Sequence, residues 1–161
     1  MTPHTNFVET ARVYCDLIDH LNGDDTVWLE QLAKLLPQLH AAVTGLDQSK
    51  SDMGACFLEQ DLDDRFELYS RLHMLLGERD SYWLEFDMSS DGQVMTGSLA
   101  DDLTDIFWEL KVGLDMLDGH PDKRHKALNR LRSSYKTHWG QHLMDAQRHL
   151  YELDTRNQLH F

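Results

Sequence analysis

The sequence predicts an all-α protein, a single-domain helical bundle of six or seven helices over residues 1–161. Two observations lead to this fold class. Apolar residues recur every three or four positions along nearly the whole chain, and the strict alternation typical of strands is confined to four-residue stretches. Gly23, Gly45, Gly77 and Gly119 lie between the periodic stretches, where helices commonly end, whereas Pro37 lies inside one stretch and should bend that helix.

The first half of the chain divides into three helices and one short segment. Apolar stripes predict helices over residues 7–21, 24–44 and 61–76, and the last of these ends at Gly77. The aromatic segment 82–86 is predicted to form about two further helical turns.

The second half contains the strongest helix signals. Ser98 precedes a long apolar stripe over residues 99–117, and Asp101 completes an S-x-x-D capping box. A second stripe continues over residues 121–153 without a phase break. Because 33 helical residues would span about 50 Å, against about 30 Å for the earlier helices, we expect a long C-terminal helix that is kinked or broken near Gly140.

Charge is divided unevenly along the chain. Residues 1–119 hold 24 Asp and Glu against 7 Lys and Arg, whereas residues 120–161 hold 4 against 8, and the net charge is −13. Such a charge repels phosphate backbones, so nucleic acid is not the expected partner. No apolar run approaches the roughly 18 residues that span a bilayer, and Cys15 and Cys56 form no C-x-x-C motif. We therefore expect a cytoplasmic protein with reduced thiols that binds no membrane.

The basic segment 120–136 has two interpretations. Its side chains either complement the acidic helices or form a patch that docks an anion or a protein, because Arg124, Arg132 and Lys136 lie close to one face. Trp108 sits beside the main apolar stripe of its helix. If exposed, Trp108 would mark a binding surface.

A row of histidines is the pattern in this chain that most resembles a metal site. His138, His142, Asp145 and His149 are spaced i, i+4, i+7 and i+11, so they project from one side of a helix. The pair His138 and His142 supplies two of the three or four ligands that zinc requires, and another helix must supply the rest. The other interpretation is that these residues are solvated or cap the helix.

Acidic residues cluster at the starts of two helices. Asp61 and Asp64 form one D-x-x-D pair, and Asp102 and Asp105 form another, with Asp101 alongside. Two acidic faces that meet over Mg²⁺ hold the triphosphate in all-α nucleotide pyrophosphatases. Acids at helix N-termini also need no metal, because they interact favourably with the helix dipole.

Several motifs of known enzyme classes are absent from the sequence. There is no E-x-x-H of di-iron bundles, no phosphate-binding loop G-x-x-x-x-G-K-[ST] and no G-x-G-x-x-G of Rossmann folds. The G-x-S-x-G motif of serine hydrolases and the H-E-x-x-H motif of zinc proteases are absent as well, which argues against all five classes.

Three segments together resemble a known family. They are Leu32–Leu39, Ala100–Lys111, and Tyr135–Gly140 with Leu143. They are similar to the bacterial domain-of-unknown-function family 5063, and the resemblance covers about residues 5–155. The resemblance implies a compact helical bacterial protein and brings no activity, substrate or catalytic residues.

Three functional hypotheses follow from the sequence. The leading one is a noncatalytic module that binds a protein partner, with no cofactor, for which a homodimer is an allowed state. The second is a metal-dependent hydrolase that resembles nucleotide pyrophosphatases and uses Asp101, Asp105, His138 and His142 if their helices converge. The third is an acidic immunity-type or DNA-mimicking protein, which requires one exposed strip of carboxylates.

Overall fold

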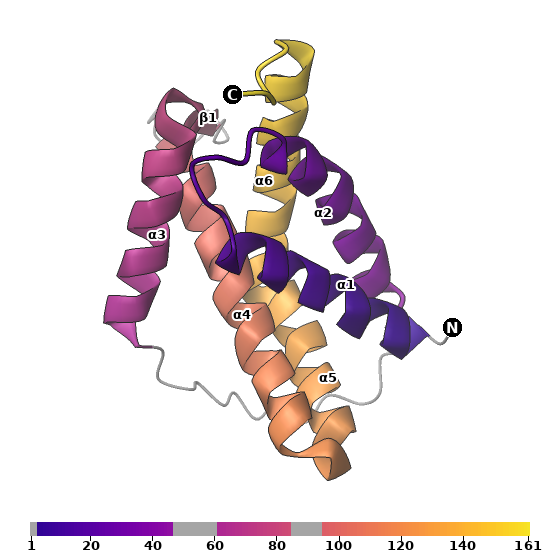
Figure 1. Ribbon diagram of the computed structural model, residues 1–161. Helices are drawn as coiled ribbons and strands as arrows, with labels where there is room; N and C mark the ends of the chain where they lie inside the picture. Colours follow the sequence, from indigo (N-terminus) through magenta and orange to yellow (C-terminus); the bar gives the residue numbers. More distant parts are fainter. Residues whose placement is uncertain (1–2, 47–60, 85–94) are drawn as a thin grey trace.

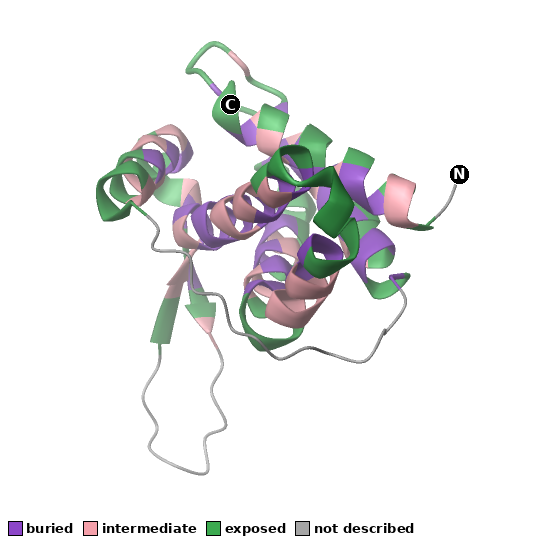
Figure 2. Cartoon of the chain, turned by 90° about the horizontal axis from the view of Figure 1, so that it is seen from below, coloured by how far each residue is buried: buried purple, intermediate pink, exposed green. Residues whose placement is uncertain are grey.

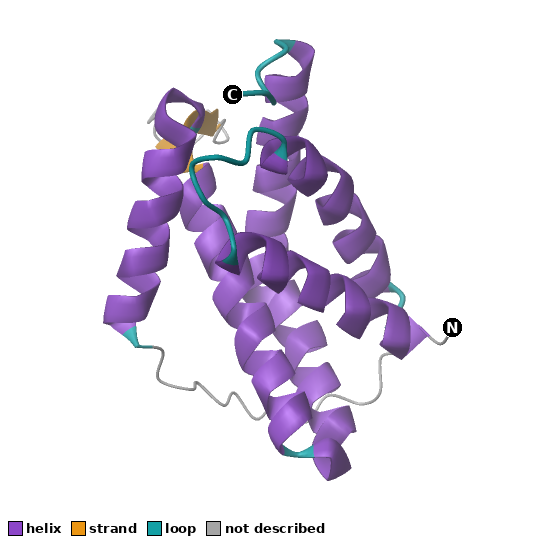
Figure 3. Ribbon diagram, viewed as in Figure 1, coloured by secondary structure: helices purple, strands orange, loops and turns teal. Residues whose placement is uncertain are grey.

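A computed structural model of the chain describes residues 3–46, 61–84 and 95–161. Cys56 and Asp91-Gly92, a dipeptide that predicts a turn, lie outside the described residues. Figure 3 shows helices in nearly every described segment and one small hairpin. The longer elements are α1 (Pro3–Asp19), α2 (Trp28–Thr44), α3 (Leu62–Leu76), β1 (Ser81–Leu84), β2 (Met95–Ser98), α4 (Leu99–Gly119), α5 (Arg124–Ser134) and α6 (Gly140–Thr155). The all-α prediction is confirmed apart from this hairpin.

Helix α4 is the central element of the bundle. It packs against α1, α3, α5 and α6, and Figure 1 shows it running through the middle of the molecule with α3 alongside. Leu103, Ile106 and Leu110 of α4 have no exposed surface. Each such burial stabilises the fold by about 1.5–3 kcal/mol relative to an exposed side chain. Figure 2 shows buried residues along the inward sides of the helices around this core.

The start of α4 is capped as the sequence predicts. The Ser98 side chain accepts a hydrogen bond from the Asp101 backbone N–H at 3.2 Å. The buried carboxylate of Asp80 adds a second acceptor, since the Ala100 N–H donates to it at 2.7 Å. These contacts satisfy backbone donors that the first helical turn leaves free, and they fix the position of the residues that follow.

The prediction of helical turns over residues 82–86 is wrong for residues 82–84, and residues 85 and 86 lie outside the described residues. Residues 81–84 form strand β1, which pairs antiparallel with β2 so that Tyr82 lies opposite Gly97. Tyr, Trp and Leu have ample strand propensity, and pairing with β2 supplies the backbone hydrogen bonds that an isolated two-turn helix would not. Strand β2 leads directly into α4, so the hairpin lies at the N-terminal end of the central helix.

The interruption predicted near Gly140 is a π-helical turn over Tyr135–Trp139. The Gly140 N–H donates to the carbonyl oxygen of Tyr135, five residues earlier. The described residues thus form five helical rods, α1 to α4 and the continuous run from α5 to α6, and not the six or seven helices predicted. The count was too high because residues 81–84 form a strand and the C-terminal run continues from α5 through the π-helical turn into α6. None of the described helices combines the length and the hydropathy needed to cross a membrane.

Candidate metal centre between α4 and α6

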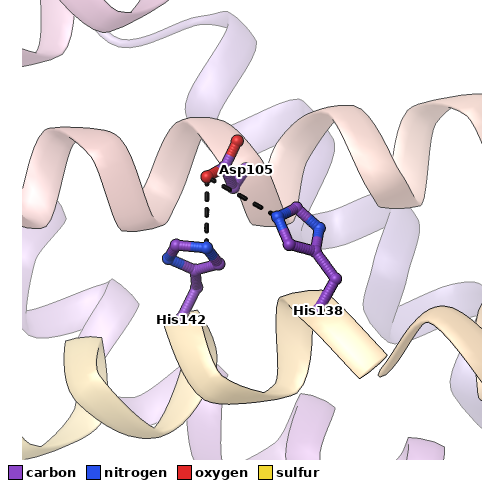
Figure 4. Close-up of side chains that lie close together, drawn as sticks. All are labelled: Asp105, His138 and His142. Atoms are coloured by element: carbon purple, nitrogen blue, oxygen red, sulfur yellow. Dashed lines mark ion pairs between the residues drawn. The ribbon is translucent and has the colours of Figure 1, made fainter. Parts of the chain in front are cut away.

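Asp105, His138 and His142 converge between α4, the π-helical turn and α6. Their ligand atoms all lie within 4.8 Å of one another. The Oδ2 atom of Asp105 is 3.2 Å from Nε2 of His142 and 4.0 Å from Nε2 of His138, as Figure 4 shows. The exposed fraction rises from 11% for the Asp105 side chain through 23% for His142 to 47% for His138. The cluster is therefore closed at Asp105 and open to solvent at His138.

Packing of the apolar stripes brings these side chains together. Leu143, Ala146 and Leu150 of α6 are buried in the core that α4 also lines. Residues beside two packed stripes must face each other across the helix interface. The spacing i, i+4 places His138 and His142 on one side of their helix, facing the Asp105 side of α4.

His142 is oriented by Asp102. Its Nδ1 lies 2.7 Å from Oδ1 of Asp102, whose side chain is buried and also accepts a hydrogen bond from the Tyr82 hydroxyl. An ionised carboxylate has no proton to donate, so Nδ1 donates to Asp102, and Nε2, the second ring nitrogen, is directed at Asp105. This is the orientation that a metal-binding imidazole requires.

Burial and hydrogen bonding have opposite effects on the pKa values of Asp102 and His142. Burial raises the pKa of the Asp102 carboxyl, although the hydrogen bonds from His142 and Tyr82 lower it. The hydrogen bond to Asp102 raises the pKa of the His142 imidazole, against the effect of its own burial. A metal ion at Nε2 would displace a proton that the metal-free pair favours, so metal binding and proton binding compete here.

His138 is held in the same manner by Glu109. Its Nδ1 lies 3.1 Å from Oε1 of Glu109, and the other oxygen of Glu109 lies 3.7 Å from Nη1 of Arg130. The two imidazole rings meet edge to face with their centroids 5.1 Å apart. Both histidines thus present Nε2 to Asp105 and Nδ1 to a separate carboxylate.

The remaining oxygen of Asp105 is bound by Arg65 of α3. The Arg65 guanidinium lies 2.5 Å from Oδ1 of Asp105 and 3.1 Å from Oδ1 of Asp101. The face of α3 that meets α4 therefore contributes a cation, and not the acidic pair that a Mg²⁺-dependent pyrophosphatase would need. Asp101 faces Arg65 and does not belong to the three-ligand group.

The sequence as a whole matches one family model, described as Domain of unknown function (DUF5063), over residues 3–156. The chain belongs to the DUF5063 family. A comparison with curated proteins finds no match. Among solved structures, the crystal structure of protein BF1032 from Bacteroides fragilis is similar with a TM-score of 0.75 and 21% identity, covering 92% of this chain and 90% of that chain. This likeness supports the fold.

The predicted partner-binding residues of the DUF5063 chain do not belong to the three-ligand group. Trp108 is half-buried, packs edge-on against Phe107 at 5.4 Å and has a buried indole N–H without a hydrogen-bond partner in the described part of the chain. Arg124 and Lys136 are exposed, whereas Arg132 is half-buried and lies 5.7 Å from the Tyr135 ring.

Two acids of α4 are not available for the exposed strip that an acidic mimic requires. Asp102 and Asp105 of α4 are both buried, where they face His142 and Arg65. A polar pocket of about 240 Å³ lies elsewhere, between α1 and α4, and is lined in part by Arg12, Asp118 and Cys15. Arg12 and Asp118 pair there at 2.6 Å, and none of the residues that line this pocket belongs to the three-ligand group.

Four residues around the cluster were not predicted as site residues: Arg65, Tyr82, Asp102 and Glu109. Asp102, Asp105 and Glu109 are spaced i, i+3 and i+7, which places them on one face of a helix. This spacing could have indicated that Asp102 and Glu109 lie beside Asp105. No local signal identifies Arg65 or Tyr82, because both reach the site from elements distant in the sequence.

Proposed function

We propose that this DUF5063 protein binds a divalent transition metal ion through Asp105, His138 and His142 and uses it to hydrolyse a substrate. One observation carries the proposal. Each histidine has Nδ1 on its own carboxylate and Nε2 directed at the same Asp105 oxygen. Solvated or capping histidines have no reason to share this arrangement, whereas metal-ligating histidines commonly do.

The donor set favours zinc and similar ions. Two imidazole nitrogens and one carboxylate suit Zn²⁺, Co²⁺ or Fe²⁺ better than Mg²⁺ or Ca²⁺, which prefer oxygen ligands. Ligand atoms about 2.1 Å from a tetrahedral metal lie about 3.4 Å apart, close to the 3.2 Å between Asp105 and His142. His138 needs only a small approach, which its exposure allows.

Three protein ligands leave at least one metal position for water. A metal ion in that geometry lowers the pKa of its bound water and creates a hydroxide nucleophile near neutral pH. The open side at His138 gives solvent and substrate a route to that position. Metal-assisted hydrolysis is therefore the reaction class that fits the arrangement.

Calorimetric titration of EDTA-stripped protein with Zn²⁺, Co²⁺ and Mg²⁺ tests the binding. We expect saturable binding of Zn²⁺ and Co²⁺, weaker binding of Mg²⁺, and a loss of at least about tenfold in affinity in His138→Ala and in His142→Ala. His125→Ala is the matched control, because His125 is exposed on α5 outside the cluster. Equal zinc affinity in all four proteins would contradict the proposal.

Hydrolysis is tested with p-nitrophenyl acetate and bis(p-nitrophenyl) phosphate in the presence of the bound metal. Turnover that requires the metal and is lost in His142→Ala supports the enzyme. Tight zinc binding without turnover of either ester would favour a noncatalytic role.

Docking of a protein partner, the leading hypothesis from the sequence, is a second candidate function, and we propose that this partner is acidic. Lys123, Arg124, Lys126 and Lys136 are exposed and form no ion pair within residues 3–46, 61–84 and 95–161. An exposed cationic group of this kind steers association with acidic surfaces. The charge reversal Arg124→Glu should weaken capture of such a partner in a cytoplasmic extract, and light scattering would show whether the partner is a second copy.

A further inference from the structure

Asp102 uses both of its carboxylate oxygens. Oδ1 accepts from His142 at 2.7 Å, and Oδ2 accepts from the Tyr82 hydroxyl in a short hydrogen bond. The residue is 4% exposed, so water cannot readily replace either donor. A buried carboxylate with one oxygen unpaired is costly, and the side chain would turn or take up a proton to relieve that cost.

Tyr82 is held in place by the hairpin and by α6. Its ring lies opposite Gly97, where an added Cβ would overlap the ring. The ring stacks on the buried His149 with centroids 4.7 Å apart, and Nε2 of His149 is 2.7 Å from the carbonyl oxygen of Arg79. Arg148 also donates a hydrogen bond to the Trp83 carbonyl at 3.0 Å, which ties β1 to α6.

A continuous set of contacts therefore joins the hairpin to the metal ligands. The hairpin fixes Tyr82, Tyr82 fixes Asp102, and Asp102 fixes the ring of His142. Only two hydrogen bonds, from Tyr82 to Asp102 and from His142 to Asp102, separate Tyr82 from the ring of His142. Displacement of Tyr82 should therefore change the position of Nε2 of His142.

We infer that Tyr82 is a positioning residue of the metal centre, which keeps Nε2 of His142 directed at Asp105 by binding the far oxygen of Asp102. The inference rests on the proposed metal binding. It assigns the β1–β2 hairpin a role in metal affinity although the hairpin supplies no ligand. By thermodynamic linkage, metal binding must in turn stabilise the seating of the hairpin by the same factor.

Zinc titration of metal-stripped Tyr82→Phe tests the inference. Loss of a group that hydrogen-bonds directly to a metal ligand commonly costs 10–100-fold in metal affinity. The Tyr82 hydroxyl acts through Asp102 and is one contact further away, so we expect a loss of roughly fivefold or more. Tyr14→Phe is the matched control. The buried Tyr14 hydroxyl donates a hydrogen bond at 2.9 Å to the carbonyl oxygen of Leu103, which lies on α4 next to Asp102, and it does not contact a metal ligand. That variant should bind zinc as the wild type does.

Gly97→Ala provides an independent variant, since it displaces the Tyr82 ring from the hairpin side and retains the hydroxyl. It should also weaken zinc binding. Protection of the backbone amides of residues 81–84 and 95–98 from hydrogen exchange should rise with zinc in the wild type and rise less in Tyr82→Phe.

A readout in the metal-free protein separates this inference from the proposed function. Nitrogen NMR shifts of the His142 ring, measured where the imidazole is neutral, should show the hydrogen on Nδ1 in the wild type and in Tyr14→Phe, and a mixture of tautomers in Tyr82→Phe. Unchanged tautomer and unchanged zinc affinity in Tyr82→Phe would overturn the inference alone. Absence of zinc binding by the wild type would overturn the proposed function, and the metal role of Tyr82 with it.

Discussion

The Nε2 atom of His142 lies 3.2 Å from Oδ2 of Asp105, close to the separation of about 3.4 Å between two ligand atoms of a tetrahedral metal ion. In the described structure this nitrogen comes from α6 and this oxygen from α4, so the packing of two core helices sets their distance. The site is consequently built on rigid elements. A substitution should therefore lower metal affinity most at a ligand, less at a residue that hydrogen-bonds to a ligand, and least at a residue outside these contacts.

Asp105→Asn should reduce zinc affinity by more than about tenfold, because a neutral amide oxygen is a far weaker ligand than a carboxylate. Asp101→Asn is the control. It removes a charge beside the same Arg65 guanidinium but lies outside the three-ligand group, so zinc affinity should change by less than about twofold. Calorimetry on both variants decides the matter, and a larger effect of Asp101→Asn would contradict the assignment of ligands.

The two supporting carboxylates should differ in importance. Asp102→Asn should weaken zinc binding more than Glu109→Gln, because Asp102 is buried and lies 2.7 Å from its histidine, whereas Glu109 is 3.1 Å from the more exposed His138. We expect losses of about 10–100-fold for Asp102→Asn and less for Glu109→Gln. Zinc titrations of the two variants at one pH test the order, and the reverse order would mean that His138 is the dominant nitrogen ligand.

The parts of this site that depend on helical spacing can be predicted from the sequence. The spacing of His138 and His142 places them on one helical side, and Ser98 with Asp101 marks where the helix that carries Asp105 begins. The sequence also indicates an interruption at Gly140, from the length of the stripe alone. These inferences depend on residues within a few turns of one another.

The residues that complete the site depend on contacts between distant segments. Tyr82 is 20 residues from Asp102, and Arg65 is 40 residues from Asp105. A four-residue aromatic strand cannot be distinguished from two helical turns by its own sequence, since its partner strand begins only at Met95. Arg65 lies among acids in a helix whose local pattern predicts an acidic face, and only packing against α4 assigns it to Asp105.

Gly140→Ala should destabilise the fold by about 2 kcal/mol or more, because a Cβ there would overlap the Tyr135 carbonyl oxygen that closes the π-helical turn. Gly119→Ala is the control, since nothing lies within 4 Å of a Cβ at that end of α4 and alanine is the better helix former. Urea unfolding of both variants measures the difference in the free energy of unfolding. A neutral Gly140→Ala would show that the turn can revert to regular α-helix.

The thiol of Cys15 should be unreactive in the native protein. Burial raises its pKa from 9.0 to about 12, with smaller contributions from the nearby acids Asp16, Asp115 and Asp19, so at about pH 8 almost none of it is thiolate. In a Cys56→Ser background, which leaves Cys15 as the sole cysteine, we expect slow reaction with a disulfide reagent at that pH and an increase of at least about tenfold in rate when the protein is unfolded in urea. The sign of the pKa shift also requires that the reactive fraction in the folded protein increase only as the pH rises toward 12. A native rate equal to the unfolded rate at about pH 8 would contradict the burial of this thiol between α1 and α4.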